Sequence, residues 1–355
     1  MNAAVSVLLK VIRIAIGAEK DVSVPIAVDW HEVFVLSKQQ GVCALCADVI
    51  VKMGESWGVE ENLRYEWMGQ AMVSELYYEK QKNVIEALAL MFADEGLRMF
   101  LMKGYAASLM YEKPNRRSAG DIDFYLFGEG EKGDAVLISK GIKVKQNEDK
   151  HSVATYEGVH LENHASFLNV QEHPSLNLLE SILESECENA SAVEVGKSSI
   201  LVPTVLHNAL FLSSHIAGHF VFEGASLKQL VDWAVFLKNN DTAIQWDKVF
   251  ALVDDAGYGT FLRCLNGIAK SYLGVNVSEL SEKDQDVGLV DKVLSEIIYP
   301  KFSEKGNAVY KLRRYMCGGW KYRLVYRESM LATFFRRGWN LFRERYLPYS
   351  KSVWK

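Results

Sequence analysis

The first 95 positions of the chain place apolar residues at the three- and four-residue intervals that are typical of amphipathic helices. The spacing predicts a helix near the N-terminus, a second helical pattern from Trp30 to Val49, and a long helix from about Val73 to Ala93. We therefore expect residues 1–95 to form an N-terminal helical region.

The pattern changes at Leu97, where short apolar runs replace the long helical ones. The stretch Asp121–Phe127 alternates as a strand does, because successive side chains of a strand point to opposite faces. Further strands are expected at Leu97–Met102, Ile142–Lys145, Val153–Tyr156 and Val159–Phe167, and helices at Tyr105–Tyr111 and Glu131–Ser139. Together these elements predict a small mixed unit of strands and helices over residues 96–172.

Beyond Pro174 the apolar spacing becomes helical again, at about 177–186, 204–220, 226–238, 246–253 and 258–272. We expect a helical domain over residues 173–310 and a basic, aromatic-rich helical tail over residues 311–355. The predicted fold class is therefore α+β, with a small mixed β-sheet core embedded between N- and C-terminal helical regions.

Two carboxylates lie at alternate positions of the expected strand Asp121–Phe127. Asp121 and Asp123 then point to one face, and Ile122 and Phe124 point to the other. Two crowded carboxylates repel each other unless a cation compensates their charge. Mg²⁺ binds such carboxylates together with substrate phosphates, and a pair of metal ions is what two-metal phosphoryl chemistry requires.

A third acid is available on a later expected strand. Alternation from Val159 onward puts His160, Glu162 and His164 on one face. If this strand pairs beside Asp121–Phe127, Glu162 completes the acidic set. It would then bind a second metal ion or activate an attacking hydroxyl.

Groups that suit phosphate binding precede the acids. Lys103 and Gly104 end an expected strand just before a short helix, where a glycine lets the backbone approach a phosphate closely and a helix N-terminus favours anions. Arg116 and Arg117 lie a few residues before Asp121, and arginine gives bidentate hydrogen bonds to phosphate oxygens.

The chain resembles the bacterial family of uncharacterised nucleotidyltransferases, within the DNA polymerase beta-like superfamily. The resemblance is carried by Leu101–Gly104, by Tyr111, Pro114 and Arg117, and by Gly120–Asp123. The resemblance extends loosely over residues 30–240. It departs from the superfamily pattern at Tyr105, where Gly or Ser usually follows the glycine, and at Ala165, where an aromatic residue is common.

This resemblance implies a metal-dependent site in which Mg²⁺ (or Mn²⁺) is bound by Asp121, Asp123 and Glu162, which are also the expected catalytic residues. The candidate nucleotide contacts are Lys103, Gly104, Tyr105, Arg116 and Arg117, and the candidate residues of the substrate cleft are His164 and His215. Asp232, an acid within an apolar helical stretch, is expected to form a salt bridge or a hydrogen bond to a histidine.

Charge is distributed unevenly along an otherwise ordinary composition of 49% hydrophobic and 24% charged residues. From Lys311 onward the chain has twelve Lys and Arg against two acids, a net +10, so the remainder carries −15 of the total −5. Such a basic tail suits an acidic partner: nucleic acid, a membrane surface or the acidic body of the same protein. The absence of a convincing signal peptide or of about 18 uninterrupted apolar residues favours a cytoplasmic location.

Three functions remain open at this point. The first is an enzyme that moves a nucleotidyl group from a nucleoside triphosphate to an unknown acceptor hydroxyl on a small molecule, a protein or an RNA. The second is a catalytically degenerate protein of the same fold that binds a nucleotide or a partner. The third is an RNA-binding protein that uses the basic C-terminal arm.

Overall fold

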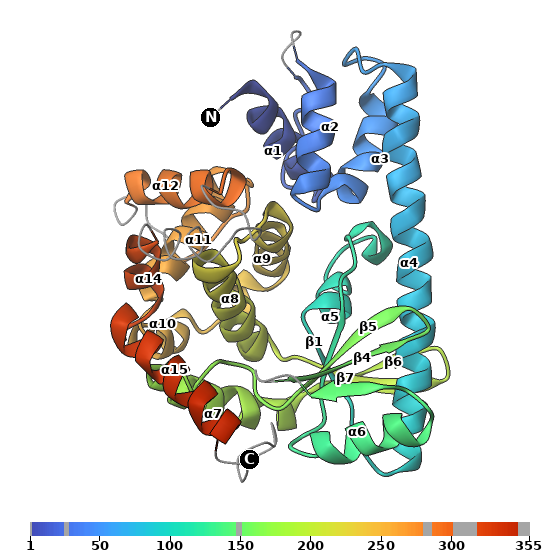
Figure 1. Cartoon of the computed structure of the whole chain (residues 1–355). Coiled ribbons are helices and arrows are strands. Elements are labelled where there is room, and N and C mark those ends of the chain that lie inside the picture. Colours follow the sequence, from blue (N-terminus) through green and yellow to red (C-terminus); the bar gives the residue numbers. More distant parts are fainter. Residues whose placement is uncertain (1, 25–27, 147–150, 280–285, 301–317, 347–355) are drawn as a thin grey trace.

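The computed structural model of the chain describes residues 2–24, 28–146, 151–279, 286–300 and 318–346. Its architecture is α+β, as expected: one mixed sheet lies among helices contributed by both ends of the chain (Figure 1). The expected start of the basic tail, Lys311 to Cys317, lies outside the described residues.

The sheet has seven strands in the order β3-β4-β5-β2-β1-β7-β6. These are β1 (Phe100–Met102), β2 (Ile122–Tyr125), β3 (Val144–Gln146), β4 (His151–Tyr156), β5 (Val159–His164), β6 (Ser191–Val195) and β7 (Ser198–Val202). Strand β2 lies at the centre, antiparallel to β1 and parallel to β5. This arrangement sets Met102 at the end of β1, Asp123 near the start of β2 and Glu162 of β5 side by side.

The N-terminal region is helical, and its four helices are α1 (Ala3–Ala15), α2 (Trp30–Gln39), α3 (Cys43–Met53) and α4 (Glu61–Asp94). The continuous pattern from Trp30 to Val49 forms two helices rather than one. Gly41 separates them, since its φ of +69° belongs to the left-handed region that ends a helix. Helix α4 is 34 residues long and runs from the other N-terminal helices down one side of the sheet (Figure 1).

One face of the sheet is covered by α4 and by α6 (Gly130–Ser139). Ile122, Phe124 and Leu126 point to this face and pack against buried residues of α4 such as Leu88 and Phe92. The alternating pattern therefore turns Asp123 to the opposite face, toward the C-terminal helices.

On the opposite face, Phe100, Met102 and Tyr125 join one apolar core with the helices of the second half of the chain. These helices are α7 (Asn177–Glu186), α8 (Val205–Phe222), α9 (Leu227–Asn240), α10 (Trp246–Ala256), α11 (Gly259–Ser271) and α12 (Val287–Ile298). Phe100 of β1 packs against His207 of α8 with ring centroids 5.0 Å apart. His207 is fully buried among aromatic rings, and this burial lowers its pKa to about 3. It is therefore a core residue and stays neutral.

The hairpin β6–β7 corrects the expectation that only helices follow Pro174. Strand β7 extends the sheet by pairing parallel to β1 through Phe100 and Leu201. Only Val195, Ser198 and Ile200 of the hairpin are buried, so its sequence lacks the strong apolar alternation by which a strand is recognised.

The described part of the basic tail forms α14 (Gly319–Val325) and α15 (Met330–Tyr346). Its basic side chains meet acids of the same protein in three ion pairs: Lys321 with Glu296, Arg327 with Asp255, and Arg337 with Glu172. Among the described residues, no helix combines the length and the apolar character that spanning a membrane requires.

Candidate active site

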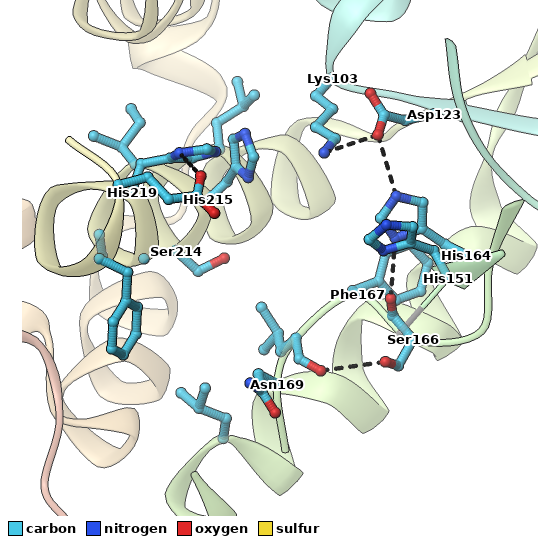
Figure 2. A pocket seen from close by; sticks show the side chains of 18 of the residues that line it. Lys103, Asp123, His151, His164, Ser166, Phe167, Asn169, Ser214, His215 and His219 are labelled. Atoms are coloured by element: carbon cyan, nitrogen blue, oxygen red, sulfur yellow. Dashed lines mark hydrogen bonds and ion pairs between the residues drawn. The ribbon is translucent and has the colours of Figure 1, made fainter. Parts of the chain in front are cut away.

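The pairing of β2 with β5 brings the predicted acids together at one edge of a large cavity. Asp123 lies directly opposite Glu162 in the parallel register, which confirms the expected pairing of these two strands. Asp121 immediately precedes β2 and opens onto the same cavity. The cavity has a volume of about 930 Å³ and is lined by all three acids. Figure 2 shows Asp123 among the residues of its wall.

Lys103 supplies a positive charge to this acidic group. Its Nζ lies 2.8 Å from Asp123 Oδ1 and 3.8 Å from Glu162 Oε2. Burial opposes the charged form of Lys103, but the two carboxylates outweigh it and raise the lysine's pKa. Burial likewise disfavours ionised Asp123, yet Lys103 and His164 hold the pKa of this carboxyl well below its usual value. Asp123 therefore remains an anion.

Two histidines lie beside the acids. His164 at the end of β5 places its Nε2 3.1 Å from Asp123 Oδ1 and 3.3 Å from Glu162 Oε2. His151 at the start of β4 places its Nε2 3.7 Å from Glu162 Oε1. Figure 2 shows both rings on the same wall of the cavity as Lys103 and Asp123.

The turn between β1 and α5 (Gly104–Ser108) positions Lys103. Lys103 and Gly104 both have φ near +34°, a conformation that L side chains adopt only at a cost. A Cβ on Gly104 would lie 2.9 Å from the backbone oxygen of Asp121, so the turn passes directly against the start of β2. Glycine is required here for close approach as well as for its φ.

Replacing Gly104 by Ala is expected to destabilise the protein and to weaken nucleotide binding, because Asp121 must shift to admit the methyl group. Gly96 offers a matched control, since its φ is +71° but a Cβ there meets nothing within 4 Å. Gly96→Ala should cost only the backbone strain, about 1–2 kcal/mol. Urea unfolding and nucleotide titration of both variants provide the comparison. If the two variants lose equal stability and bind the nucleotide equally well, the contact between the turn and Asp121 has no importance.

Arg117 lines the cavity, but its guanidinium is already bound by a buried acid. It donates to Asp232 of α9 through Nε at 2.7 Å and Nη2 at 2.8 Å, and Tyr111 donates to the same carboxylate at 2.6 Å. The partner expected for Asp232 therefore exists, and it is an arginine rather than a histidine. This cluster ties the segment before β2 to the helical domain.

The structure does not bring all the candidate nucleotide contacts to this cavity. Arg116 forms ion pairs with Asp48 and Glu75 and lines a separate cavity beside α3. Tyr105 points into the core beneath α4, where its ring stacks on Tyr78 with centroids 5.1 Å apart. The bulky ring of Tyr105 therefore does not occupy the main cavity.

Lys228 at the start of α9 is a cation that the sequence analysis did not single out. It lines the cavity, and its Nζ lies 4.0 Å from the position of a Cβ on Gly120, the residue before Asp121. Burial and the nearby Arg117 lower its pKa. Within the described part of the chain, no carboxylate lies within ion-pair distance of Lys228.

The opposite wall of the cavity comes from α8. His215 and His219 stand there with ring centroids 4.4 Å apart, across from the acids (Figure 2). His219 pairs with Glu223 at 2.7 Å. Arg337 and Asn340 of α15 also line the cavity, so the C-terminal tail contributes to its wall. The expected cleft residues His164 and His215 thus face one space from two sides.

The residues present fit divalent cations. Asp121, Asp123 and Glu162 line the same cavity with three carboxylates, and Lys103 forms ion pairs with two of them. Burial and, after it, the charges of Glu162 and Asp123 raise the pKa of Asp121. A hard cation bound by these oxygens would relieve this repulsion.

A sheet that carries Asp-x-Asp at the start of one strand and a third acid on its parallel neighbour, above a lysine-glycine turn, defines a nucleotidyltransferase-type core. The sequence profile of the uncharacterised nucleotidyltransferase family matches residues 27–274. The chain belongs to this family. The expected membership is therefore confirmed over most of the sequence.

The other comparisons add little detail. A crystal structure of an antigenic nucleotidyltransferase-like protein from Paracoccidioides brasiliensis is 14% identical, and the match covers 55% of this chain and 93% of that one with a TM-score of 0.32. At that score the likeness carries no weight beside the topology described above. A search of curated proteins finds no match.

His151 and Lys228 are site residues that the sequence analysis missed. The strand expected at Val153 begins two residues earlier in the structure, and its antiparallel pairing sets His151 opposite His164. The alternation of His151 with Val153 could have indicated this position. No local signal distinguishes Lys228 from an ordinary basic residue in the first turn of a helix.

Proposed function

We propose that the chain transfers a nucleotidyl group from a nucleoside triphosphate to an acceptor hydroxyl. The observation that carries this proposal is the convergence of Asp121, Asp123 and Glu162 on one large cavity, through the register of β2 and β5. Membership of a nucleotidyltransferase family supports it.

Asp121 and Asp123 would hold Mg²⁺ or Mn²⁺ with the triphosphate, and Glu162 would hold a second cation. When bound, the cations supply the charge that neutralises the phosphates as the transfer proceeds. Lys103 keeps Asp123 ionised and ready to bind metal, and the rigid turn at Gly104 fixes the start of β2. The protein's contribution is then mainly positioning and charge neutralisation.

In the proposed reaction the acceptor oxygen forms a bond to the α-phosphorus of the triphosphate. The bond from that phosphorus to the oxygen bridging to the β-phosphate breaks, and pyrophosphate leaves. The proton of the acceptor hydroxyl passes to solvent, which the open cavity admits. His215 and Ser214 on the opposite wall lie where an acceptor would be held.

The direct test is transfer of label. The protein is incubated with each of the four triphosphates labelled at the α-phosphate, with Mg²⁺ or Mn²⁺, and with small-molecule, RNA and protein fractions of a cell extract. Label in one fraction, together with released pyrophosphate, is the expected result. Tight triphosphate binding with no transfer to any fraction would instead favour a degenerate binding protein.

Lys228 is the cation that we assign to the phosphates. Its Nζ lies beside Gly120, the residue before Asp121, at the wall of the cavity. Lys228 is half-buried and has no ion-pair partner within the described residues, and a charge that is partly withdrawn from water costs free energy unless a ligand compensates it. Lys228→Met is expected to weaken triphosphate binding at least tenfold, since hydrogen bonds to charged groups contribute about 1.5–3 kcal/mol.

Lys248→Met is the matched control for this prediction. Lys248 is an exposed lysine on α10 that lies outside the lining of the cavity. Calorimetric titration of the four triphosphates into both variants separates the two positions. If both variants bind as tightly as the unaltered protein, the phosphates lie elsewhere in the cavity.

A further inference from the structure

His151, Glu162 and His164 place three metal-binding donor atoms within 4.8 Å of one another. The three residues come from the antiparallel strands β4 and β5, where His151 is the register partner of His164. Among the described residues, theirs is the sole group of three or more such side chains. The geometry points to a transition-metal site here, formed by two imidazoles and one carboxylate.

The hydrogen bonds of His164 set its ring for metal binding. Nδ1 faces the backbone oxygen of Ser166 at 3.3 Å, and a carbonyl oxygen only accepts, so Nδ1 must carry a proton. Nε2 then faces Asp123 Oδ1 and Glu162 Oε2, which also only accept. Either a proton on Nε2 or a metal cation between Nε2 and the two anionic oxygens would satisfy all three atoms.

The same arrangement is the usual one for a histidine that binds a metal. Such a ring donates its other N–H to a backbone carbonyl or a carboxylate, which fixes both its tautomer and its orientation. His164 has this support from Ser166, and it is buried within the wall, with 1% of its side chain exposed. The ring is thus held in place before any metal binds.

The ligand set also determines the kind of metal. Mg²⁺ and Mn²⁺ prefer oxygen ligands, while imidazole suits ions such as Zn²⁺, Ni²⁺ and Co²⁺. The site therefore differs from the carboxylate pair Asp121 and Asp123, which offers oxygen alone. The inference extends the proposed function by giving Glu162 a cation of a different class, and it is testable without any nucleotide.

The test is titration of Co²⁺ into chelator-treated, full-length protein without a histidine tag, in the presence of excess Mg²⁺. Visible absorption bands report binding, because they arise from Co²⁺ in the ligand field of the protein. We expect one Co²⁺ per chain. His164→Ala and His151→Ala should each weaken binding by at least about 10–100-fold, since loss of a group that only supports a ligand already has an effect of that size.

His215→Ala is the matched control, since it removes an imidazole from the opposite wall of the same cavity and should leave Co²⁺ binding unchanged. Far-ultraviolet circular dichroism checks folding, and Glu162→Gln gives a third ligand variant at a less buried position. Failure of Co²⁺ to bind over Mg²⁺, or binding that survives both changes at His151 and His164, would overturn the inference.

Nucleotide titration with Mg²⁺ keeps this inference separate from the proposed function. Triphosphate binding without Co²⁺ binding would remove only the transition-metal site. Co²⁺ binding without triphosphate binding or transfer would leave the metal site and remove only the proposed reaction.

Discussion

Asp123→Asn is expected to reduce nucleotidyl transfer by about 10³-fold or more. Charge stabilisation by a bound metal ion contributes several kcal/mol, and each 1.36 kcal/mol corresponds to a factor of ten in rate. Asp123 is the acid on which the site converges, since both Lys103 and His164 contact its Oδ1. The measurement is the rate of pyrophosphate release in the presence of the acceptor fraction identified by labelling.

Glu194→Gln is the control for this change. It removes an exposed carboxylate from β6, the edge strand that is separated from β2 by β1 and β7. Its rate should equal that of the unaltered protein. A folded Asp123→Asn protein that retains more than a tenth of the activity would show that this acid does not hold the catalytic metal.

Asp232→Asn is expected to lower the free energy of unfolding by about 3–5 kcal/mol, because it leaves the buried guanidinium of Arg117 without its charged partner. Both side chains of this pair are 6% exposed. Burial opposes the charge on Arg117, but Asp232 outweighs it and raises the pKa of the guanidinium, so the arginine cannot escape the penalty by losing its proton.

A double-mutant cycle with Arg117→Met measures the coupling between the two residues. The double variant should recover much of the lost stability, since a buried ion pair is often replaceable by apolar groups.

The exposed pair Arg98–Glu188 is the control: it has two hydrogen bonds of 2.9 Å, yet more than half of each side chain is exposed. Arg98→Met should scarcely move the urea midpoint, because water screens the pair. An equal loss at both sites would contradict the importance assigned to burial.

The acidic centre of the site could be predicted because it depends on strand alternation. The alternating stretch from Asp121 fixed which side chains share a face, and the same rule applied to Glu162 predicted the third acid. Gly104 was identifiable as a close-approach glycine for a similar reason, since few other residues tolerate such a turn.

The rest of the site depends on contacts between distant segments, which no local pattern records. Arg117 looked like a phosphate ligand until its partner on α9, Asp232, was in place. Tyr105 looked like an obstacle to the nucleotide, but the stacking with Tyr78 on α4 turns it into the core. His151 and Lys228 reach the cavity only through strand pairing and helix packing.

The role of the basic tail likewise depends on contacts with distant segments that its sequence does not record. Its composition suited nucleic acid, a membrane or the acidic body of the protein. The described part supports the last of these through the ion pairs of Lys321, Arg327 and Arg337 with acids of the body. Because Arg337 also lines the cavity, the tail is a part of the site's wall as well as a surface feature.

The central claim is that Asp121 and Asp123 form a working nucleotide–metal site. The measurement that tests it most directly is calorimetric titration of ATP, CTP, GTP and UTP, each with and without Mg²⁺, into the unaltered protein and into the double variant Asp121→Asn/Asp123→Asn. The account predicts binding of at least one triphosphate that requires Mg²⁺ and disappears in the double variant. Binding that is independent of Mg²⁺ or unaffected by the double substitution, or no binding of any triphosphate to the unaltered protein, would contradict it.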